Sequence, residues 1–178
     1  PQHRRQRQMC IRDSYETINV ITRKKVIVQS KKIKNYIIDF TNLDGYKKVI
    51  KKGDVVIASI GTTQSKVNFN KNEYRKVDND ILLNIAKACK SNEASSFSFV
   101  SSAGANAKNN NFYLKLKGEI EKSIIQLDLK SCLIFRPSLL LGKRNEFRFG
   151  EMIAQKIMPL FSFLMKSDYK PIKAVDVA

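Results

Sequence analysis

Tyr113 and Lys117 lie four residues apart in the segment NFYLKLKGE, residues 111–119, which has the apolar periodicity of an amphipathic helix. In a helix this spacing places a phenol and an ammonium group on the same face. A cation beside a tyrosine lowers the pKa of the phenol from about 10 toward neutrality, which suits the phenol to proton exchange with a carbonyl oxygen. The pair therefore raises the hypothesis of a proton-transfer site.

The same spacing also arises by chance in a chain this rich in lysine. Lysine and arginine make up 33 of 178 residues, and six tyrosines would meet a lysine at the fourth following position about once. A second pair, Tyr169 and Lys173, has Pro171 between its members, which excludes the helical turn that would place both side chains on one face. Spacing alone leaves two interpretations, a catalytic pair or two surface residues, and the surrounding elements must decide.

Apolar, β-branched runs alternate with helical patterns from residue 15 onward, at intervals typical of βαβ units around a buried parallel sheet. The sequence therefore predicts a doubly wound, Rossmann-like α/β fold. The predicted strands are residues 18–23, 35–40, 54–61, 96–102 and 132–137. The predicted helices are residues 43–52, 72–91 and 112–129. The predicted buried face of the longest helix consists of Ile81, Leu82, Ile85, Ala86 and Cys89.

Polar residues, glycine or proline follow the apolar run at the end of each predicted strand. In open parallel sheets, ligands bind beyond the carboxyl ends of the strands. We therefore expect a cofactor-sized groove at this edge of the sheet. Its candidate residues are Arg23, Asp39, Phe40, Ile60, Gly61, Thr62, Ser101, Ser102, Arg136, Pro137 and Ser138.

The formal net charge of +17 raises the alternative of a nucleic-acid or anionic-membrane partner. The lysines are scattered along the chain, however, and no interleaved aromatic residues offer a stacking surface for bases. A solvated lysine-rich surface is the favoured interpretation, and no specific nucleic-acid partner is expected. The longest apolar run, residues 152–165, is interrupted by Lys156 and Pro159 and is shorter than the roughly 20 residues that span a bilayer.

Cysteine and histidine usage limits the chemistry. Cys10, Cys89 and Cys132 show no metal-ligand spacing, and their odd number favours structural thiols in a reducing compartment, for which we predict the cytoplasm. The single histidine is His3, so a Ser-His or Cys-His nucleophile and a histidine-rich metal site lack a suitable base or ligand. We expect no metal site.

Both termini differ in character from the rest of the chain. Residues 1–14 carry four arginines without apolar periodicity. A basic arm for nucleic acid is one interpretation, and a non-native or disordered segment is the favoured one. At the other end, the sequence stops where a helix starts, with Asp176 as the expected N-cap. We expect both termini to be truncated.

The segments FVSSAGA, FYLKLKGEIE and CLIFRPSLLLG, preceded by ITRK, DF and IGTT, resemble the atypical short-chain dehydrogenase/reductases, particularly the Tat-interacting oxidoreductase-like branch. The resemblance runs from about residue 15 to residue 178. It rests on a serine strand, a Tyr-x-x-x-Lys helix and an Arg-Pro strand in family order. It implies a partial NAD(P)-binding Rossmann domain over residues 15–178 and an NADP(H)-dependent oxidoreductase that transfers hydride to a carbonyl.

The resemblance also implies roles for individual residues. Ser102 would hydrogen-bond the substrate carbonyl, with Ser101 as the alternative, Tyr113 would exchange its phenolic proton, and Lys117 would hold the nicotinamide ribose. Lys115, two residues from Tyr113, would point elsewhere and be dispensable. Arg136 is interpreted as structural. The further cofactor-binding residues that the resemblance implies are Arg23, Lys24, Asp39, Phe40, Ile60, Gly61, Thr62, Pro137 and Ser138.

The type of dinucleotide follows from the residues after the first predicted strand. Arg23 with Lys24 can clasp a 2′-phosphate, which favours NADP(H) over NAD(H), whereas a surface arginine is the alternative interpretation. The resemblance places Asp39 and Phe40 beside adenine, and Gly61 lets the backbone approach the cofactor closely. Asp78 stands where relatives often have asparagine, and a carboxylate on the helix surface is an equally good interpretation.

One departure from the family pattern concerns the diphosphate. The family's first strand and glycine-rich loop are missing from this chain, so we expect weak cofactor binding and an unpaired sheet edge. The alternative function is a non-catalytic NADP(H)-sensing module for protein interaction on the same fold. The expected partner is accordingly a small-molecule carbonyl substrate or a protein, and homo-oligomerisation stays open.

Overall fold

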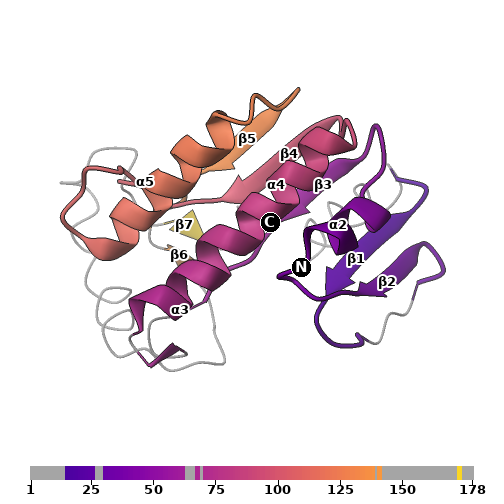
Figure 1. The fold of residues 1–178 in the computed structure, drawn as a ribbon, viewed down its shortest axis with the longest axis horizontal. Helices are drawn as coiled ribbons and strands as arrows, with labels where there is room; N and C mark the ends of the chain where they lie inside the picture. Colours follow the sequence, from indigo (N-terminus) through magenta and orange to yellow (C-terminus); the bar gives the residue numbers. More distant parts are fainter. Residues whose placement is uncertain are drawn as a thin grey trace. The chain divides into compact units, whose positions relative to one another are not determined.

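The computed structural model describes residues 15–26, 30–62, 67–68, 70–138, 140–141 and 172–173 (Figure 1). The chain divides into two compact units. Unit 1 comprises residues 1–98 and 123–133, and unit 2 comprises residues 99–122 and 134–178. The expectations for residues 1–14, for the apolar run at 152–165, for Tyr169 and for Asp176 lie outside the described residues.

Parallel strand pairing is confirmed in both units. In unit 1, β1 (Ile18–Thr22) pairs in parallel with β2 (Ile33–Ile37), from Ile18 opposite Ile33 to Thr22 opposite Ile37. In unit 2, β6 (Leu140–Leu141) pairs in parallel with β7 (Ile172–Lys173). A three-stranded sheet has the order β3-β4-β5, with β3 at Val55–Ala58, β4 at Ser96–Val100 and β5 at Cys132–Phe135.

Asparagine side chains accept hydrogen bonds from backbone N–H groups in the first turns of α2 (Leu43–Val49), α3 (Lys71–Arg75) and α5 (Phe112–Ile125), as the preference of asparagine for the N-cap position predicts. The Asn42 side chain accepts a hydrogen bond from the Asp44 N–H at the start of α2. Asn70 does the same for α3, and Asn111 accepts from the Leu114 N–H in the first turn of α5. A π-helical turn, η2 (Lys76–Asp80), connects α3 to α4 (Ile81–Ser91).

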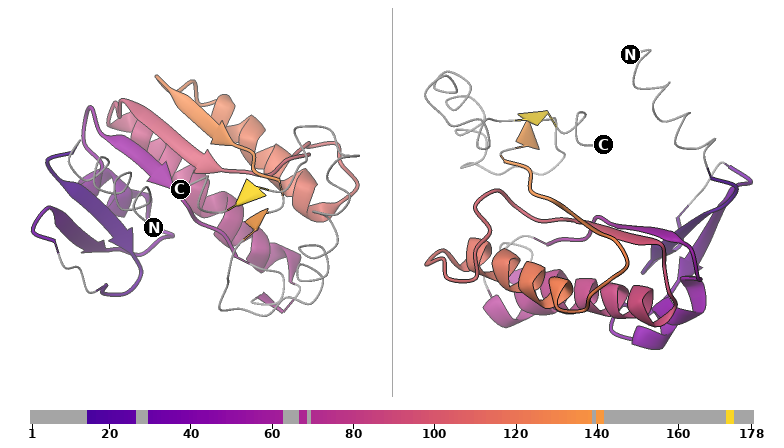
Figure 2. Two further views of the ribbon diagram at one scale, coloured as in Figure 1. Left: turned by 180° about the vertical axis from the view of Figure 1, so that it is seen from behind. Right: turned by 90° about the horizontal axis from the view of Figure 1, so that it is seen from above.

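The core of unit 1 forms around α4. In this unit α2 packs against α4, and Figure 2 shows both helices on the same face of the strands. The predicted face of α4 is confirmed, because each of its members is at most 7% exposed: Ile81, Leu82, Ile85, Ala86 and Cys89. Burial raises the pKa of the Cys89 thiol to about 12, so this thiol stays protonated at neutral pH.

The second predicted strand is displaced from its predicted position, residues 35–40, to Ile33–Ile37. The ladder closes with the Ile38 N–H, which donates to the Thr22 carbonyl. Beyond it, the Asp39 carboxylate accepts hydrogen bonds from both the N–H and the hydroxyl of Thr41, at 2.9 and 2.8 Å. This local turn draws the chain away from β1, so Asp39 and Phe40 lie in a connection and not on the strand.

The other predicted strands are confirmed with shorter ends, and the last predicted helix ends at Ile125 instead of residue 129. The helix stops because the N–H groups of Leu127 and Asp128 bond to carbonyls three residues back, and Asp128 adopts a positive φ of 50°. Among the described residues, the helices are all too short or too polar to cross a membrane.

Candidate active site

The face of α5 that carries Tyr113 also carries Lys117, as the sequence predicts. The ammonium nitrogen of Lys117 lies 5.8 Å from the centroid of the Tyr113 ring. Lys117 is only 4% exposed, whereas Tyr113 is half-buried and Lys115 is exposed. Lys117 is therefore not a surface residue, and Lys115 differs from it in being exposed. The role of Tyr113 and Lys117 as a catalytic pair stays a prediction.

Gly118 brings the preceding loop into backbone contact with this part of α5. A Cβ atom at Gly118 would lie 2.2 Å from the nitrogen of Ala107 and 2.3 Å from the carbonyl carbon of Asn106. The Asn106 N–H also donates to the Leu114 carbonyl at 3.1 Å. The loop is thus fixed against the helix immediately after Lys117. Gly118 was not among the predicted site residues, although a glycine inside a predicted helix was the available signal.

The serine end of β4 continues beside the end of β5 in unit 2. The Ser101 N–H donates to the Phe135 carbonyl at 2.7 Å, and the Ala103 N–H donates to the Pro137 carbonyl at 3.0 Å. The structure thus brings the predicted serine segment next to Pro137, one of the predicted nicotinamide-side residues. Ser138 follows in the same extended segment and is half-buried.

The two serines differ in the state of their hydroxyl groups. The Ser102 hydroxyl donates to the Ala103 carbonyl at 3.3 Å. The Ser101 hydroxyl is buried and has no hydrogen-bond partner within the described part of the chain. Buried hydroxyls are nearly always paired, so this group has capacity for a ligand or a water molecule. The choice of Ser102 as the substrate-binding serine stays a prediction, and the geometry gives Ser101 the open hydroxyl.

Arg136 forms a two-pronged ion pair with Glu121, as its structural interpretation anticipates. Its Nε and Nη2 atoms donate to the two carboxylate oxygens at 2.9 and 2.5 Å. Glu121 is only 4% exposed, and its carboxylate raises the pKa of Arg136 above the ordinary value. Glu121 stands one helical turn beyond Lys117, so the pair ties the end of β5 to the face of α5 that carries the candidate catalytic residues.

In unit 1, the guanidinium carbon of Arg23 lies 5.7 Å over the ring of Phe40, within cation–π range. Arg23 and Lys24 are exposed just after β1. The Thr22 hydroxyl donates to the Lys24 carbonyl at 2.7 Å and so fixes the turn that contains Arg23. The structure therefore brings two of the predicted adenosine-side residues together and leaves the cations accessible. Asp39 is turned toward Thr41 by its hydrogen bonds.

Asp78 is 1% exposed, so the interpretation of a helix-surface carboxylate is wrong. It lies in η2, and its carboxylate accepts a hydrogen bond from the Thr62 N–H at 2.7 Å. A Cβ atom at Gly61 would lie 3.8 Å from the same carboxylate. Asp78 thus holds the segment after β3, which contains the predicted cofactor residues Ile60, Gly61 and Thr62. Single π-helical turns inside helices are frequent at functional sites.

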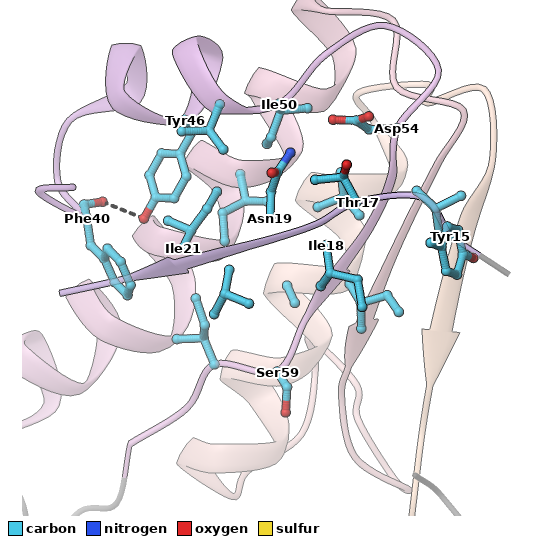
Figure 3. A pocket seen from close by; sticks show the side chains of 18 residues that line it. Tyr15, Thr17, Ile18, Asn19, Ile21, Phe40, Tyr46, Ile50, Asp54 and Ser59 are labelled. Atoms are coloured by element: carbon cyan, nitrogen blue, oxygen red, sulfur yellow. Dashed lines mark hydrogen bonds between the residues drawn. The ribbon is translucent and has the colours of Figure 1, made fainter. Parts of the chain in front are cut away.

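A pocket of about 460 Å³ opens between β1 and β3 in unit 1 (Figure 3). The Tyr46 hydroxyl donates to the Phe40 carbonyl at its wall, at 3.1 Å. Of the predicted cofactor residues, Phe40 and Ile60 line this pocket. The described residues contain no cluster of three or more metal-ligating side chains.

The parallel strand pairs, the helices that follow β2, β3 and β4, and the polar strand ends define a Rossmann-like α/β protein. Solved structures with this fold are similar to the chain. WbmH from Bordetella bronchiseptica, solved in complex with NAD+, covers 79% of this chain with a TM-score of 0.63 at 13% identity. The gox2253 structure covers 89% of the chain with a TM-score of 0.63 at 15% identity. The matches span 54% of each of those two chains.

Sequence relatives narrow this class to a family. Protein HTATIP2 from Rattus norvegicus is 31% identical over 145 residues, which cover 80% of this chain and 59% of that protein. Protein FMP52, mitochondrial, from Candida albicans is 34% identical over 147 residues, which cover 80% of this chain and 64% of that protein. No family model matches the chain. The chain belongs to the HTATIP2/FMP52-like atypical short-chain dehydrogenase/reductases.

Proposed function

We propose that the chain is part of an NADP(H)-dependent oxidoreductase that reduces a carbonyl compound, with Tyr113 as the proton donor. The observation that carries this proposal is the placement of the Lys117 ammonium 5.8 Å from the Tyr113 ring on a helix fixed by backbone contact. The fold is that of NAD(P)-binding proteins, and a solved neighbour of similar fold contains NAD+.

The residues of α5 and the serine segment have complementary roles in this reaction. NADPH, when bound, supplies the hydride for the carbonyl carbon. As negative charge builds on the carbonyl oxygen, the Tyr113 hydroxyl donates its proton to that oxygen. The Lys117 ammonium favours the phenolate that this leaves behind, because an adjacent cation stabilises the anion. A hydroxyl of the serine segment, from Ser102 or Ser101, orients the carbonyl by a hydrogen bond.

The described residues of each unit include groups that suit a dinucleotide. In unit 1, the exposed Arg23 and Lys24 suit a 2′-phosphate, since guanidinium and ammonium groups bind phosphate oxygens. In unit 2, the buried hydroxyl of Ser101 has capacity for a ligand, and Lys117 and Pro137 are residues that the family resemblance assigns to the nicotinamide side. The seven glycines of the chain form no Gly-x-x-Gly-x-x-Gly cradle for the diphosphate. Activity is therefore to be tested on the polypeptide of the full reading frame.

The deciding experiment follows the oxidation of NADPH by its absorbance in the presence of a panel of aldehydes and ketones. We expect the full-length polypeptide to reduce at least one of them. Tyr113→Phe should lower kcat by about 100-fold or more because it removes the proton donor. Lys117→Met should lower kcat as well, whereas Lys115→Met should leave it unchanged because Lys115 is exposed two residues away.

Tyr36→Phe serves as the matched control for the tyrosine, since Tyr36 lies on β2 in unit 1 and is 36% exposed. A polypeptide that binds NADPH but oxidises it with no carbonyl of the panel, and whose binding is the same in Tyr113→Phe, contradicts the reductase proposal. That outcome favours the alternative of an NADP(H)-sensing interaction module. It would also leave the fold and the cofactor preference intact.

The preference for NADP(H) has its own test. We expect Arg23→Ala to weaken NADPH binding by about tenfold while NADH binding changes little, because only NADPH carries the 2′-phosphate. Lys24→Ala should act in the same direction with a smaller effect, since an ammonium makes no two-pronged contact with phosphate. Calorimetric titration of both nucleotides measures the difference. An equal loss for both nucleotides contradicts the assignment of Arg23.

A further inference from the structure

The turn after β1 concentrates positive charge on the surface of unit 1. Arg23, Lys24 and Lys25 are consecutive, and all three are exposed. Adjacent like charges repel one another, which favours conformations that separate them. The position of these cations therefore depends on what holds the backbone of the turn.

Asn35 on β2 holds this turn from the neighbouring strand. It stands opposite Val20 in the parallel register of β1 and β2. Its side-chain oxygen accepts a hydrogen bond from the Val26 N–H at 3.0 Å. Its Nδ2 atom donates to the Val20 carbonyl at 3.0 Å and to the Thr22 hydroxyl at 2.7 Å. The Asn35 amide thus connects the last residues of β1 to the chain beyond the turn.

The bonding partners fix the orientation of the Asn35 amide. A backbone carbonyl such as that of Val20 can only accept a hydrogen bond, and the Val26 N–H can only donate one. Exchanging the oxygen and the nitrogen of the amide would set acceptor against acceptor and donor against donor. An aspartate would lack the N–H for the Val20 carbonyl, and a leucine of similar size would form none of these bonds. Asparagine is therefore the residue type that suits all three partners.

The Thr22 hydroxyl extends these bonds to the cations. It accepts from Asn35 and donates to the Lys24 carbonyl at 2.7 Å. The chain of bonds therefore runs from the Val26 N–H through Asn35 and Thr22 to Lys24. Hydrogen bonds connected in this way strengthen one another. The backbone of Arg23 and Lys24 is consequently held between two bonded points.

We propose that Asn35 is a positioning residue for nucleotide specificity, which holds Arg23 and Lys24 where they bind the 2′-phosphate of NADP(H). The inference rests on the proposed preference for NADP(H). A turn that is already held in its binding conformation loses less conformational freedom when the phosphate binds, and this raises the affinity without a further contact. Asn35 is half-buried and bonds only to the protein in this network, so it acts through the two cations.

The test measures the binding of NADPH and NADH to the full-length polypeptide by calorimetric titration. Asn35→Leu keeps the approximate size of the side chain and removes its hydrogen bonds. We expect this variant to weaken NADPH binding about fivefold and to change NADH binding less than about twofold, because only NADPH presents a 2′-phosphate to the turn. Hydrogen exchange of the Val26 N–H should become about fivefold faster without nucleotide, since the amide loses its acceptor.

Asn92→Leu is the matched control, because Asn92 forms a comparable set of bonds elsewhere in unit 1. Its Nδ2 atom donates to the Lys47 and Ile50 carbonyls, both at 2.7 Å, at the end of α2. Asn92 is half-buried like Asn35, so both variants should lower the stability of the protein. Only Asn35→Leu should change the ratio of the dissociation constants for NADPH and NADH.

A second variant breaks the chain of bonds at another residue. Thr22→Val removes the hydroxyl that links Asn35 to the Lys24 carbonyl and keeps a β-branched side chain at the end of β1. We expect NADPH binding to weaken about threefold, with NADH binding little changed. This variant decides the question if Asn35→Leu does not fold.

A combination of substitutions tests whether Asn35 acts through the two cations. In a polypeptide that already carries Arg23→Ala and Lys24→Ala, Asn35→Leu should weaken NADPH binding no further. The reason is that effects of residues that act as one unit do not add. A further loss of about fivefold in this background would mean that Asn35 affects the nucleotide by another route.

Several results would overturn the role of Asn35 alone, in a protein where Arg23→Ala still weakens NADPH binding selectively. They are equal weakening of both nucleotides by Asn35→Leu, unchanged NADPH binding in Asn35→Leu and Thr22→Val, the further loss in the combined variant, and a matching change of the nucleotide ratio in Asn92→Leu. Failure of the proposed NADP(H) preference gives a different result. In that case Arg23→Ala itself affects both nucleotides equally or neither, and the role of Asn35 fails with it.

Discussion

The residues proposed for chemistry in unit 2 and those proposed for the cofactor in unit 1 are held in different ways. Tyr113 and Lys117 lie on a helix that contacts a loop through backbone atoms at Gly118 and is tied to β5 by the Arg136–Glu121 pair. Arg23 and Lys24 lie on an exposed turn, and their neighbour Phe40 is held in a connection. Packing therefore fixes the first group, and short hydrogen-bonded turns fix the second.

Because of this difference, substitutions in unit 2 should affect stability, whereas substitutions in the exposed turn of unit 1 should affect binding. A change at a closely packed position of unit 2 must move backbone atoms, so the cost appears in the free energy of unfolding. A change in the exposed turn of unit 1 removes charge or a local bond, and leaves the core of α4 intact. Stability measurements on matched pairs of variants, one from each unit, can test this contrast.

The largest expected effect is at Gly118. Gly118→Ala would place its Cβ 2.2 Å from the Ala107 nitrogen, and backbone atoms cannot yield as a flexible side chain can. We expect the free energy of unfolding to fall by about 3 kcal/mol in urea titration. The matched variant Gly45→Ala, also inside a helix, meets only Ile38 side-chain atoms at 3.3 Å or more. Its cost should stay below about 1 kcal/mol, because alanine favours the helix. Equal losses in the free energy of unfolding of the two variants would contradict the idea that close backbone packing distinguishes Gly118.

The next largest effect is expected for ion pairs of unlike burial. Arg136→Met leaves the carboxylate of Glu121, which is 4% exposed, without its guanidinium partner. We expect a loss of about 2 kcal/mol, less than for a fully buried pair because the Arg136 side chain is 54% exposed. Lys52→Met in unit 1 removes a pair whose side chains are 81% and 66% exposed, and should have no measurable effect. Thermal and urea unfolding of both variants check the ranking, and a larger loss for Lys52→Met reverses it.

Much of the fold could be predicted from the sequence because its signals are local. The alternation of β-branched runs with amphipathic helices predicted the parallel strands, and the apolar period of residues 81–89 predicted the buried face of α4. Helical spacing also predicted that Tyr113 and Lys117 lie on the same face of α5. These features depend on residues within two turns of one another, where periodicity is informative.

The features that could not be predicted depend on contacts between distant segments. The burial of Asp78 arises from a π-helical turn and from the Thr62 N–H, 16 residues away. The shift of β2 depends on the turn at Asp39, which competes with the ladder to β1. The burial of the Ser101 hydroxyl without a hydrogen-bond partner among the described residues depends on its surroundings in the fold. Periodicity cannot encode such choices between local and tertiary hydrogen bonds.

A third pair of variants tests whether a buried hydrogen-bonded residue, Asp78, also stabilises unit 1. Asp78→Ala leaves the Thr62 N–H without its acceptor in a partly buried environment, and we expect a loss of about 1.5 kcal/mol in the free energy of unfolding. Asp78→Asn keeps an acceptor oxygen at the same place, so its loss should be smaller. If the free energy of unfolding falls equally in both variants, the carboxylate acts through its charge or packing and not through this hydrogen bond. A loss for alanine as large as that of Gly118→Ala would show that the two units are held alike.

The smallest expected effect is in the exposed turn that follows β2. Hydrogen bonds from the Thr41 N–H, and then from the Thr41 hydroxyl, lower the pKa of Asp39 below its ordinary value. Because the folded-state pKa is lowered, the contribution of Asp39 to stability is present above its unfolded pKa of about 4 and is lost as the pH falls through the folded value. Carboxyl carbon NMR titration measures this pKa.

Thr41→Val removes the hydroxyl but keeps the N–H, so the pKa of Asp39 should rise only part of the way toward its ordinary value. The unfolding transition at neutral pH should hardly move, because the Asp39 side chain is exposed. A full return of the pKa would mean that the hydroxyl bond outweighs the backbone bond. A marked loss of stability at neutral pH would instead mean that this turn, like Gly118 in unit 2, contributes to the packing of its unit. That result would contradict the contrast between the exposed turn of unit 1 and the packed helix of unit 2.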